Sequence, residues 1–131
     1  MKTRIRKAKK SDYPKIKKLV SDYPGKLIVE LLPEVNDFFV AEAGGEIVGC
    51  CALEVYSKRL AQVRSLAVAA SHHGKGIGSS LVTRCVLLAR KKKIEELLAI
   101  TSADKFFYKN GFRLYKRGRI PMYLKPNAKR K

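Results

Sequence analysis

The chain has 131 residues, the size of one ordinary domain, and combines 46% hydrophobic residues with a net charge of +18, from 29 Lys and Arg against 11 Asp and Glu. This composition can form a core without disulfide or metal staples. No stretch of 18 apolar residues occurs, which excludes a membrane-spanning helix. The N-terminus lacks the apolar run of a secretory signal, which favours a cytoplasmic protein.

The first third of the chain predicts a strand and then a helix. Residues 3–7 are a short strand candidate, and residues 11–12 offer caps for the helix. The apolar positions of that helix recur at helical spacing and are Ile16, Leu19, Val20 and Tyr23. The Pro-Gly pair at 24–25 ends it. Residues 26–36 are ambiguous, and one interpretation is a short second helix that stops near Pro33.

The middle of the chain predicts an antiparallel meander. Residues 38–41 form a first strand, and the Gly-Gly pair at 44–45 is a hairpin signal. Residues 47–56 form a long second strand and residues 60–69 a third, with the turn between them at 57–59.

The last third predicts a crossover. A long helix over residues 76–92 has its apolar face at Ile77, Leu81, Val82, Cys85, Leu88 and Ala89. Residues 97–100 read as a buried strand parallel to the preceding one. Ser102 caps a short helix that Gly111 ends, and strands follow at 112–116 and 121–124.

These elements predict an α/β fold with a mixed, mostly antiparallel sheet and helices on both faces. No linker or repeat divides the chain, so we expect one domain over residues 1–124 and a basic tail over residues 125–131.

The cysteines lack metal or redox spacing and are predicted to be reduced core thiols; they are Cys50, Cys51 and Cys85. His72 and His73 have no ligand partners at suitable spacing, so no metal site is expected.

Three alternating glycines, Gly74, Gly76 and Gly78, follow a strand and open the long helix. Glycines let main-chain N–H groups approach a phosphate, and a helix N-terminus adds unpaired donors and positive charge. Lys75 contributes a mobile cation. The patterns for ATP and dinucleotide binding are absent, since Ser79 stands where the last glycine of the dinucleotide pattern would be. Because such glycines cost helix stability, an anion site is favoured over a turn that is merely tight.

Two motifs give the chain a family resemblance. The strand Val63–Val68, ending in Leu-Ala-Val, and the loop Gly74–Gly78 resemble the central motif of the GNAT superfamily of N-acetyltransferases. Residues 106–112, ending in Gly-Phe, resemble its second signature. The compact GNAT domain of N-acetylglutamate synthase is the most similar form. The resemblance implies a fold whose central strands splay apart, with acetyl-CoA as co-substrate.

The resemblance also implies which residues contact the cofactor. The backbone of Leu66, Ala67 and Val68 would pair with the pantetheine arm, and a backbone N–H near Leu66 or Val68 would polarise the thioester carbonyl. The pyrophosphate would lie on the loop formed by His73, Gly74, Lys75, Gly76, Ile77, Gly78 and Ser79. His73 replaces the Gln or Arg that usually begins this loop.

The expected catalytic groups depart from the family pattern. Phe107 occupies the position beside the cofactor where relatives carry the Tyr that protonates the departing thiolate, and Tyr108 follows it, turned about 100° around the helix. The side chain of Tyr108 either reaches the sulfur of the cofactor or only packs against the protein or faces water. Gln62 stands where many relatives carry a glutamate base, and Glu54 on the neighbouring strand could act as base through water.

Two functions follow. The first is transfer of acetyl from acetyl-CoA to a primary amine of an amino acid, peptide or protein, for which the positive field suits an acidic acceptor. The alternative is a basic GNAT-fold protein that associates with nucleic acid and has weak or no transferase activity. The protein is expected to act as a monomer, or as a homodimer formed through its final strands.

Overall fold

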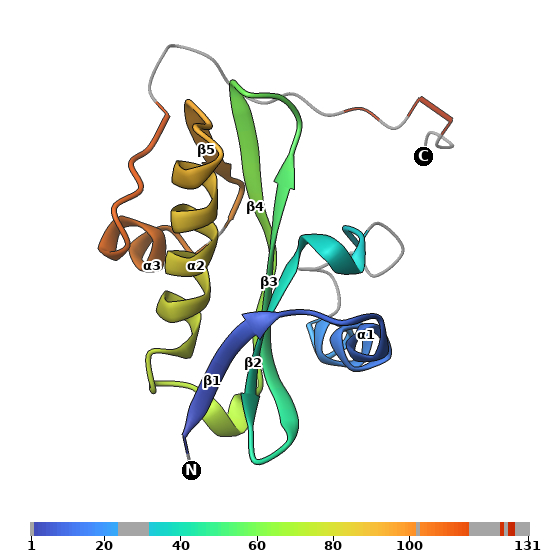
Figure 1. The fold of residues 1–131 in the computed structure, drawn as a ribbon. Helices are drawn as coiled ribbons and strands as arrows, with labels where there is room; N and C mark the ends of the chain where they lie inside the picture. Colours follow the sequence, from blue (N-terminus) through green and yellow to red (C-terminus); the bar gives the residue numbers. More distant parts are fainter. Residues whose placement is uncertain (1, 24–31, 102, 116–123, 125, 128–131) are drawn as a thin grey trace.

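The computed structural model describes residues 2–23, 32–101, 103–115, 124, 126 and 127. Within these residues a five-stranded sheet in the order β1-β2-β3-β4-β5 forms the middle layer (Figure 1). Its strands are β1 (Thr3–Lys7), β2 (Phe38–Ala43), β3 (Glu46–Val55), β4 (Leu60–Val68) and β5 (Glu96–Ala99). Neighbouring strands are antiparallel except β4 and β5, which are parallel. The meander and the crossover predicted from the sequence are confirmed.

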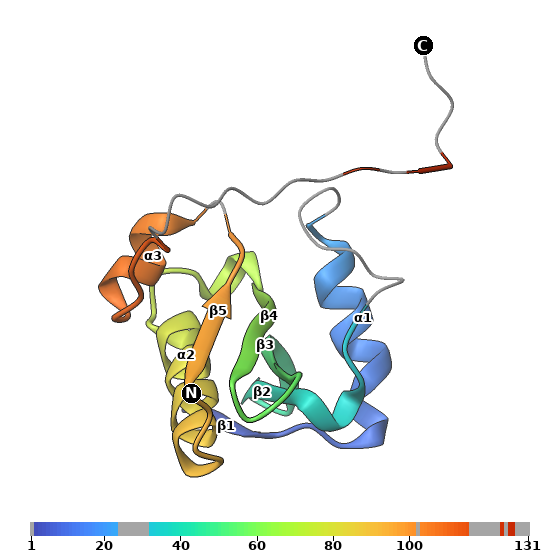
Figure 2. The same ribbon diagram turned by 90° about the horizontal axis from the view of Figure 1, so that it is seen from above.

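Helices cover both faces of the sheet, as expected. Helix α1 (Tyr13–Ser21) lies on one face, and α2 (Ile77–Lys91) and α3 (Asp104–Lys109) lie on the other (Figures 1 and 2). Short 3₁₀ turns are η1 (Lys10–Asp12), η3 (Val35–Asp37) and η4 (Ala70–His72). The sheet therefore separates two hydrophobic cores. Successive residues along one strand point to opposite faces and so enter different cores.

Cys50 and Cys51 illustrate this alternation in β3. Cys50 packs in the core under α1, whereas Cys51 packs in the core under α2 with its Sγ 3.7 Å from that of Cys85. All three thiols are free and buried. Burial raises the pKa of Cys50 to about 12, so this thiol stays protonated and unreactive at neutral pH.

Helix α2 packs close to the sheet on the face that its apolar spacing predicts. Its buried residues are Ile77, Leu81, Val82, Cys85 and Ala89. Gly49 in β3 lies beneath them, and a Cβ at this position would meet Cδ1 of Leu81 at 3.0 Å and Cγ2 of Ile77 at 3.2 Å. The close approach fixes the N-terminal turn of α2 against the middle of the sheet.

Two local expectations are wrong. Asp12 occupies the N-cap position of α1, but its side chain makes no cap hydrogen bond there; its carboxylate instead accepts from the backbone N–H of Lys9 at 2.7 Å and from the half-buried guanidinium of Arg6, a charge-assisted partner. Residues 112–115 form no strand, because the N–H of Phe112 donates to Phe107 O at 2.9 Å and continues the end of α3.

The strand predicted at 97–100 is displaced and only half-buried. It spans Glu96–Ala99, and Ile100 lies outside it with an exposed side chain. The predictions for 24–31, for 116–123 and for the cap at Ser102 lie outside the described residues, and Leu124 is not in a strand. Of the predicted tail, only residues 126 and 127 are described, and they lie in a turn.

Candidate functional site

The parallel pairing of β4 with β5 stops halfway along β4. It runs from Leu60 opposite Glu96 to Val63 opposite Ala99, and the described residues give no β5 partner to 64–68. Just beyond the last pair, Ser65 has a φ of 55° and the register between β3 and β4 shifts. The bulge re-aims the strand, so the sheet splays at this point, as the family resemblance implies.

The splayed end of β4 leads directly into the glycine loop. Gly74 and Gly76 have φ values of 77° and 78°, in the left-handed region that glycine adopts without strain, and Gly76 is the N-cap of α2. The first backbone bond that closes the helix runs from Ser80 N–H to Gly76 O at 3.0 Å. Among the described residues, no acceptor is found for the main-chain N–H groups of 74–79, which are the donors that an anion would use.

His73 is exposed, and its ring contacts the end of β4. Its Nε2 lies 2.7 Å from the carbonyl oxygen of Val68 and 3.1 Å from the hydroxyl of Tyr23, and Tyr23 also donates to Val68 O. Both contacts with Val68 O are hydrogen bonds when His73 carries its proton on Nε2. His73 and Tyr23 then each donate to the carbonyl oxygen of Val68, which has two lone pairs to accept them. The last carbonyl of β4 is thus tied to α1 and to the loop.

A polar cluster lies on the α1 face of the β3–β4 hairpin. Glu54 and Gln62 are cross-strand partners, and the Oε1 of Glu54 lies 2.8 Å from Nη1 of Arg64. The hydroxyl of Tyr56 lies 2.7 Å from both Glu54 Oε1 and Gln62 Oε1. Since a phenol has a single proton, Tyr56 can donate to Glu54 and accept from the Gln62 amide if that amide is turned over.

The cluster keeps Glu54 ionised. The hydrogen bond from Tyr56 has the largest effect and lowers the pKa of Glu54. Burial comes second and raises it, and the hydrogen bond and charge of Arg64 lower it again, so that the net shift is downward. Burial, and then the bond to Glu54, raise the pKa of Tyr56. At neutral pH the cluster therefore presents a carboxylate and a guanidinium side by side.

Helix α3 supports the glycine loop from the α2 side. The amide nitrogen of Asn110 donates to the hydroxyl of Ser79 at 3.2 Å, and a Cβ on Gly78 would lie 3.4 Å from the ring of Phe106. Phe107 is buried in the core under α2, edge-on to Phe106 and Phe112. Tyr108 lies on the same helix with an exposed side chain.

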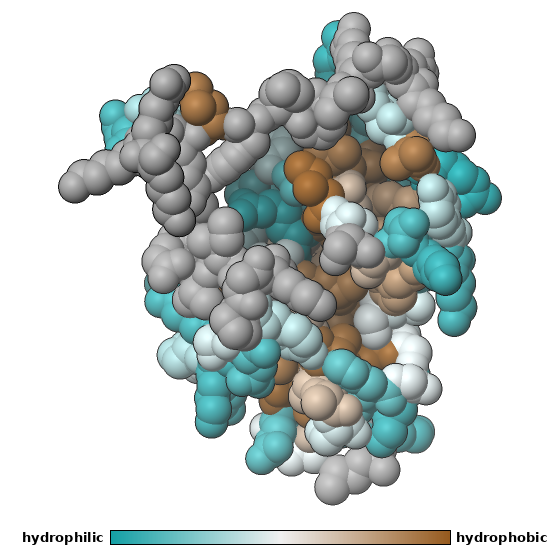
Figure 3. Space-filling model, turned by 180° about the vertical axis from the view of Figure 1, so that it is seen from behind, coloured by the Kyte–Doolittle hydropathy of each residue, from teal (hydrophilic) through white to brown (hydrophobic). Residues whose placement is uncertain are grey.

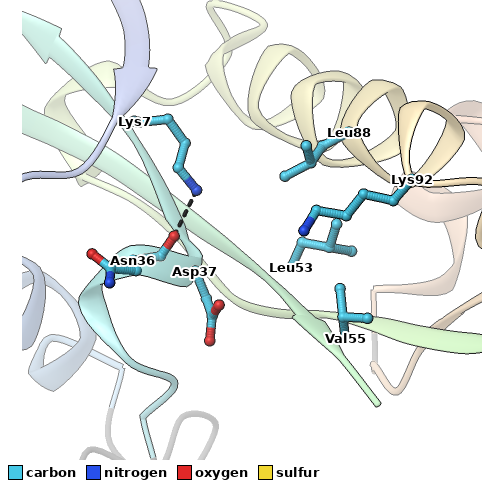
Figure 4. Close-up of a pocket in the computed structure, with 7 residues that line it drawn as sticks. All are labelled: Lys7, Asn36, Asp37, Leu53, Val55, Leu88 and Lys92. Atoms are coloured by element: carbon cyan, nitrogen blue, oxygen red, sulfur yellow. Dashed lines mark hydrogen bonds between the residues drawn. The ribbon is translucent and has the colours of Figure 1, made fainter. Parts of the chain in front are cut away.

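A cavity of about 360 Å³ occurs elsewhere, between η3, β3 and the C-terminal end of α2. Its lining residues are Lys7, Asn36, Asp37, Leu53, Val55, Leu88 and Lys92 (Figure 4). Lys7 Nζ donates across it to Asn36 O at 2.6 Å. None of the residues predicted for the site lines this cavity, so the candidate site lies at the splayed strands and not in the cavity.

On the side of the molecule opposite β1, an apolar band runs between hydrophilic margins (Figure 3).

The structure thus brings the predicted residues together in two groups. Val68, His73 and the glycine loop form one, and Glu54 with Gln62 forms the other. Sequence reasoning missed Arg64, Tyr56 and Tyr23. The hairpin register could have found Arg64, because a turn at 57–59 places position 64 diagonally across from Glu54 on the same face. Nothing local could have found Tyr23, whose partner Val68 is 45 residues away.

Within the described ranges, no group of three or more His, Cys, Asp or Glu side chains could hold a metal ion. The helices of the described part also lack the combined length and apolar character needed to cross a bilayer.

Known proteins share both the sequence and the fold. Residues 34–114 match the family model of the acetyltransferase (GNAT) domain. An amino-acid acetyltransferase of Mycobacterium tuberculosis is 37% identical over 116 residues, which cover 82% of this chain and 67% of the relative. A crystal structure of a Mycobacterium tuberculosis protein in complex with CoA and a second ligand has a TM-score of 0.79 and 33% identity, over 90% of this chain and 76% of that one.

N-acetylglutamate synthase of Neisseria gonorrhoeae, crystallised with CoA and N-acetyl-glutamate, has a TM-score of 0.72 at 23% identity. The match covers 85% of this chain but 28% of the synthase, so it concerns one part of a much longer protein. At this identity the likeness shows the fold alone.

Proposed function

The chain belongs to the GNAT family of N-acetyltransferases, and we propose that it transfers the acetyl group of acetyl-CoA directly to the primary amine of a small molecule. The family and fold expected from the sequence are confirmed, including the likeness to N-acetylglutamate synthase. No observation on the described residues or the relatives favours the alternative of a nucleic-acid-associated protein. One structural observation carries the proposal: the end of β4 beyond its last described pair with β5 lies beside a left-handed glycine loop that opens a helix.

The loop supplies the binding site for the pyrophosphate. Its main-chain N–H groups over 74–79 lie at the positive end of α2, where a diphosphate gains hydrogen bonds and a favourable dipole. Lys75, Ile77 and Ser79 contribute their backbone N–H groups, and Lys75 adds its charge. No side chain covers the loop at Gly74 or Gly76, since a Cβ added there would meet no described atom within 4 Å.

The pantetheine arm lies along β4 beyond the last described pair with β5. Backbone groups of Leu66, Ala67 and Val68 that point away from β3 would pair with the amides of the arm, as a strand would. The Tyr23 and His73 donors on Val68 O must then share this carbonyl with the arm or move. His73, once released, stands at the first position of the loop and would reach the pyrophosphate.

The chemistry is an attack of the neutral amine nitrogen on the thioester carbonyl carbon. A C–N bond forms, the backbone N–H of Leu66 stabilises the oxyanion, and the C–S bond breaks to release a thiolate. Glu54, aided by Gln62 and water, accepts the proton that the amine loses. Tyr108 is the group we assign to protonate the thiolate, because Phe107 is buried and carries no acidic proton.

Calorimetric titration with CoA tests the proposal. Gly76→Asp places a carboxylate among the phosphate donors and should weaken CoA binding at least about tenfold, or abolish it. Gly45→Asp is the matched control, because Gly45 has a nearly equal φ of 80° and equally open surroundings but lies in the β2–β3 hairpin. Absence of saturable CoA binding to the wild-type protein, or equal loss in both variants, would refute the assignment.

A further inference from the structure

The cavity beside the C-terminal end of α2 lies apart from the proposed acetyl-transfer site. Leu53 lines it from β3 and belongs to the core under α2, so the cavity lies on the sheet face opposite to the one that carries Glu54. The glycine loop precedes the other end of α2, and 15 helical residues at about 1.5 Å each separate the two ends by about 22 Å. A small ligand in this cavity therefore does not contact the glycine loop.

Two ammonium groups enter the cavity from opposite walls. Lys7 ends β1 and Lys92 is the C-cap of α2, and Figure 4 shows both side chains pointing into the space between them. Nζ of Lys7 donates to Asn36 O at 2.6 Å, and because an ammonium has three donors, two of them are not used by the described residues. Within the described part of the chain, Nζ of Lys92 has no hydrogen-bond acceptor or ion-pair partner. Both groups can therefore donate to a ligand in the cavity.

The acidic group of the lining, Asp37, does not neutralise these lysines. No ion pair joins Asp37 to Lys7 or Lys92 among the described residues. Burial lowers the pKa of Lys7 most, the charge of Asp37 raises it, and the charge of Lys92 lowers it, so the two ammonium groups repel each other across the cavity. Two positive groups and one negative group leave the lining with one excess positive charge.

The rest of the lining offers a place for a hydrocarbon group. Val55 keeps 41% of its surface exposed, and Leu88 is half-buried. Covering these side chains removes apolar surface from water, which favours binding. The volume of about 360 Å³ is within the range of natural small-molecule sites. The cavity therefore suits a small molecule that combines an apolar body with a negative head group.

We propose that this cavity is a second ligand site, which binds a small organic monocarboxylate with its carboxylate between Lys7 and Lys92 and its apolar part against Val55 and Leu88. The inference stands whether or not the chain transfers acetyl groups, because it uses none of the residues proposed for that reaction. A monoanion matches the one excess positive charge, whereas a phosphate monoester carries a charge of about −1.5 to −2 and is repelled more strongly by Asp37. An amine is repelled by both lysines, and a neutral molecule gains no charge-assisted hydrogen bond from them.

Amide chemical shifts in NMR spectra of the wild-type protein test the proposal with hexanoate, hexanamide and hexylammonium, which have the same chain length. Hexanoate should shift the amides of Leu53, Val55 and Lys92 saturably and leave those of residues 74–79 in place. Its Kd should be at least about fivefold below that of hexanamide, the effect of one unit charge about 4 Å away in a water-exposed site, and hexylammonium should bind more weakly than hexanamide. Equal affinity for hexanoate and hexanamide, or no saturable shift around the cavity, would overturn the proposal without any variant that has to fold.

Two charge variants distinguish ligand binding from a purely structural role of the same residues. Lys92→Gln should raise the Kd for hexanoate about fivefold, and Asp37→Asn should lower it by a similar factor, because it removes the charge that repels the carboxylate. Arg90→Gln is the control, since it removes an exposed charge from the same end of α2 but lies two residues from Leu88, about 200° around the helix. It should keep the wild-type Kd. Weaker binding in Asp37→Asn, or an unchanged Kd in Lys92→Gln, would refute the assignment.

Discussion

Nε2 of His73 lies 2.7 Å from the carbonyl oxygen of Val68, and this contact ties the start of the glycine loop to the end of β4. Tyr23 donates to the same oxygen from the end of the α1 segment. Two segments that are 50 residues apart in the sequence therefore share one acceptor. Since a carbonyl with two donors retains one when the other is removed, the two side chains should not contribute independently to stability.

A double-mutant cycle on these two side chains tests this coupling. Tyr23→Phe and His73→Ala should each lower the free energy of unfolding by about 0.5–1 kcal/mol. The double variant should lose more than the sum of the single losses, by about 0.5 kcal/mol, because the carbonyl then keeps neither side-chain donor. Urea unfolding of the four proteins measures the coupling, and strictly additive losses would contradict it.

Asp12 is expected to be the most important acidic side chain for stability. It is 5% exposed, lies 2.7 Å from Arg6 Nη1 and also accepts from Lys9 N–H. Asp12→Ala should lower the free energy of unfolding by about 2–3 kcal/mol, because it removes the nearly buried carboxylate and leaves the half-buried guanidinium of Arg6 with Glu42 alone. Glu95→Ala breaks the exposed pair with Arg59 and should change it by less than about 0.5 kcal/mol. Chemical denaturation compares them, and similar losses in the two variants would argue against the prediction.

Acid should weaken the fold through the same carboxyl group. The hydrogen bond from Arg6 lowers the pKa of Asp12 in the folded protein, whereas the unfolded chain has the ordinary value of about 3.9. The unfolded state then binds the proton first, so this contribution is complete above about pH 5 and is lost as pH falls through the lower folded-state pKa. Asp12→Asn should lose less stability than wild type between pH 6 and pH 3. Parallel curves for the two proteins in urea titrations at several pH values would count against this account.

Tyr108 is the test of the leaving-group chemistry. Tyr108→Phe should lower kcat about 10- to 100-fold with little change in KM for acetyl-CoA, because the hydroxyl acts only once the C–S bond breaks. Tyr115→Phe removes an exposed phenol from the segment after α3 and serves as the control. Steady-state thiol release at saturating acceptor measures both. An unchanged kcat in the first variant would mean that solvent protonates the thiolate.

The sequence allowed the fold and the conformation of the glycine loop to be predicted because both depend on local patterns. Alternating apolar residues set the meander, 3.6-residue spacing set α2, and glycines at 74 and 76 occupy left-handed positions that other residues avoid. Contacts between distant segments could not be predicted in this way. Tyr23 was placed on an apolar helix face by its spacing, yet its hydroxyl bonds to Val68. The strand expected at 112–116 is absent over the described residues 112–115 for a local reason, since the N–H of Phe112 donates to Phe107 O and the two rings pack together.

Gly49 gives the most direct test of how the sheet positions the glycine loop. In Gly49→Ala the added methyl group would lie 3.0 Å from Leu81, 3.2 Å from Ile77 and 3.3 Å from Ala41, closer than normal contacts. The overlap should lower the free energy of unfolding by about 1–3 kcal/mol. Because Ile77 begins α2 directly after the Gly76 cap, pushing the helix outward should also weaken CoA binding in calorimetry. Leu81→Val shortens the nearest side chain and removes the overlap that the methyl group creates. This substitution should therefore cost less stability in the Gly49→Ala protein than in the wild-type protein. If Gly49→Ala were as stable as wild type and bound CoA equally well, α2 would not be held at its position by close packing against β3.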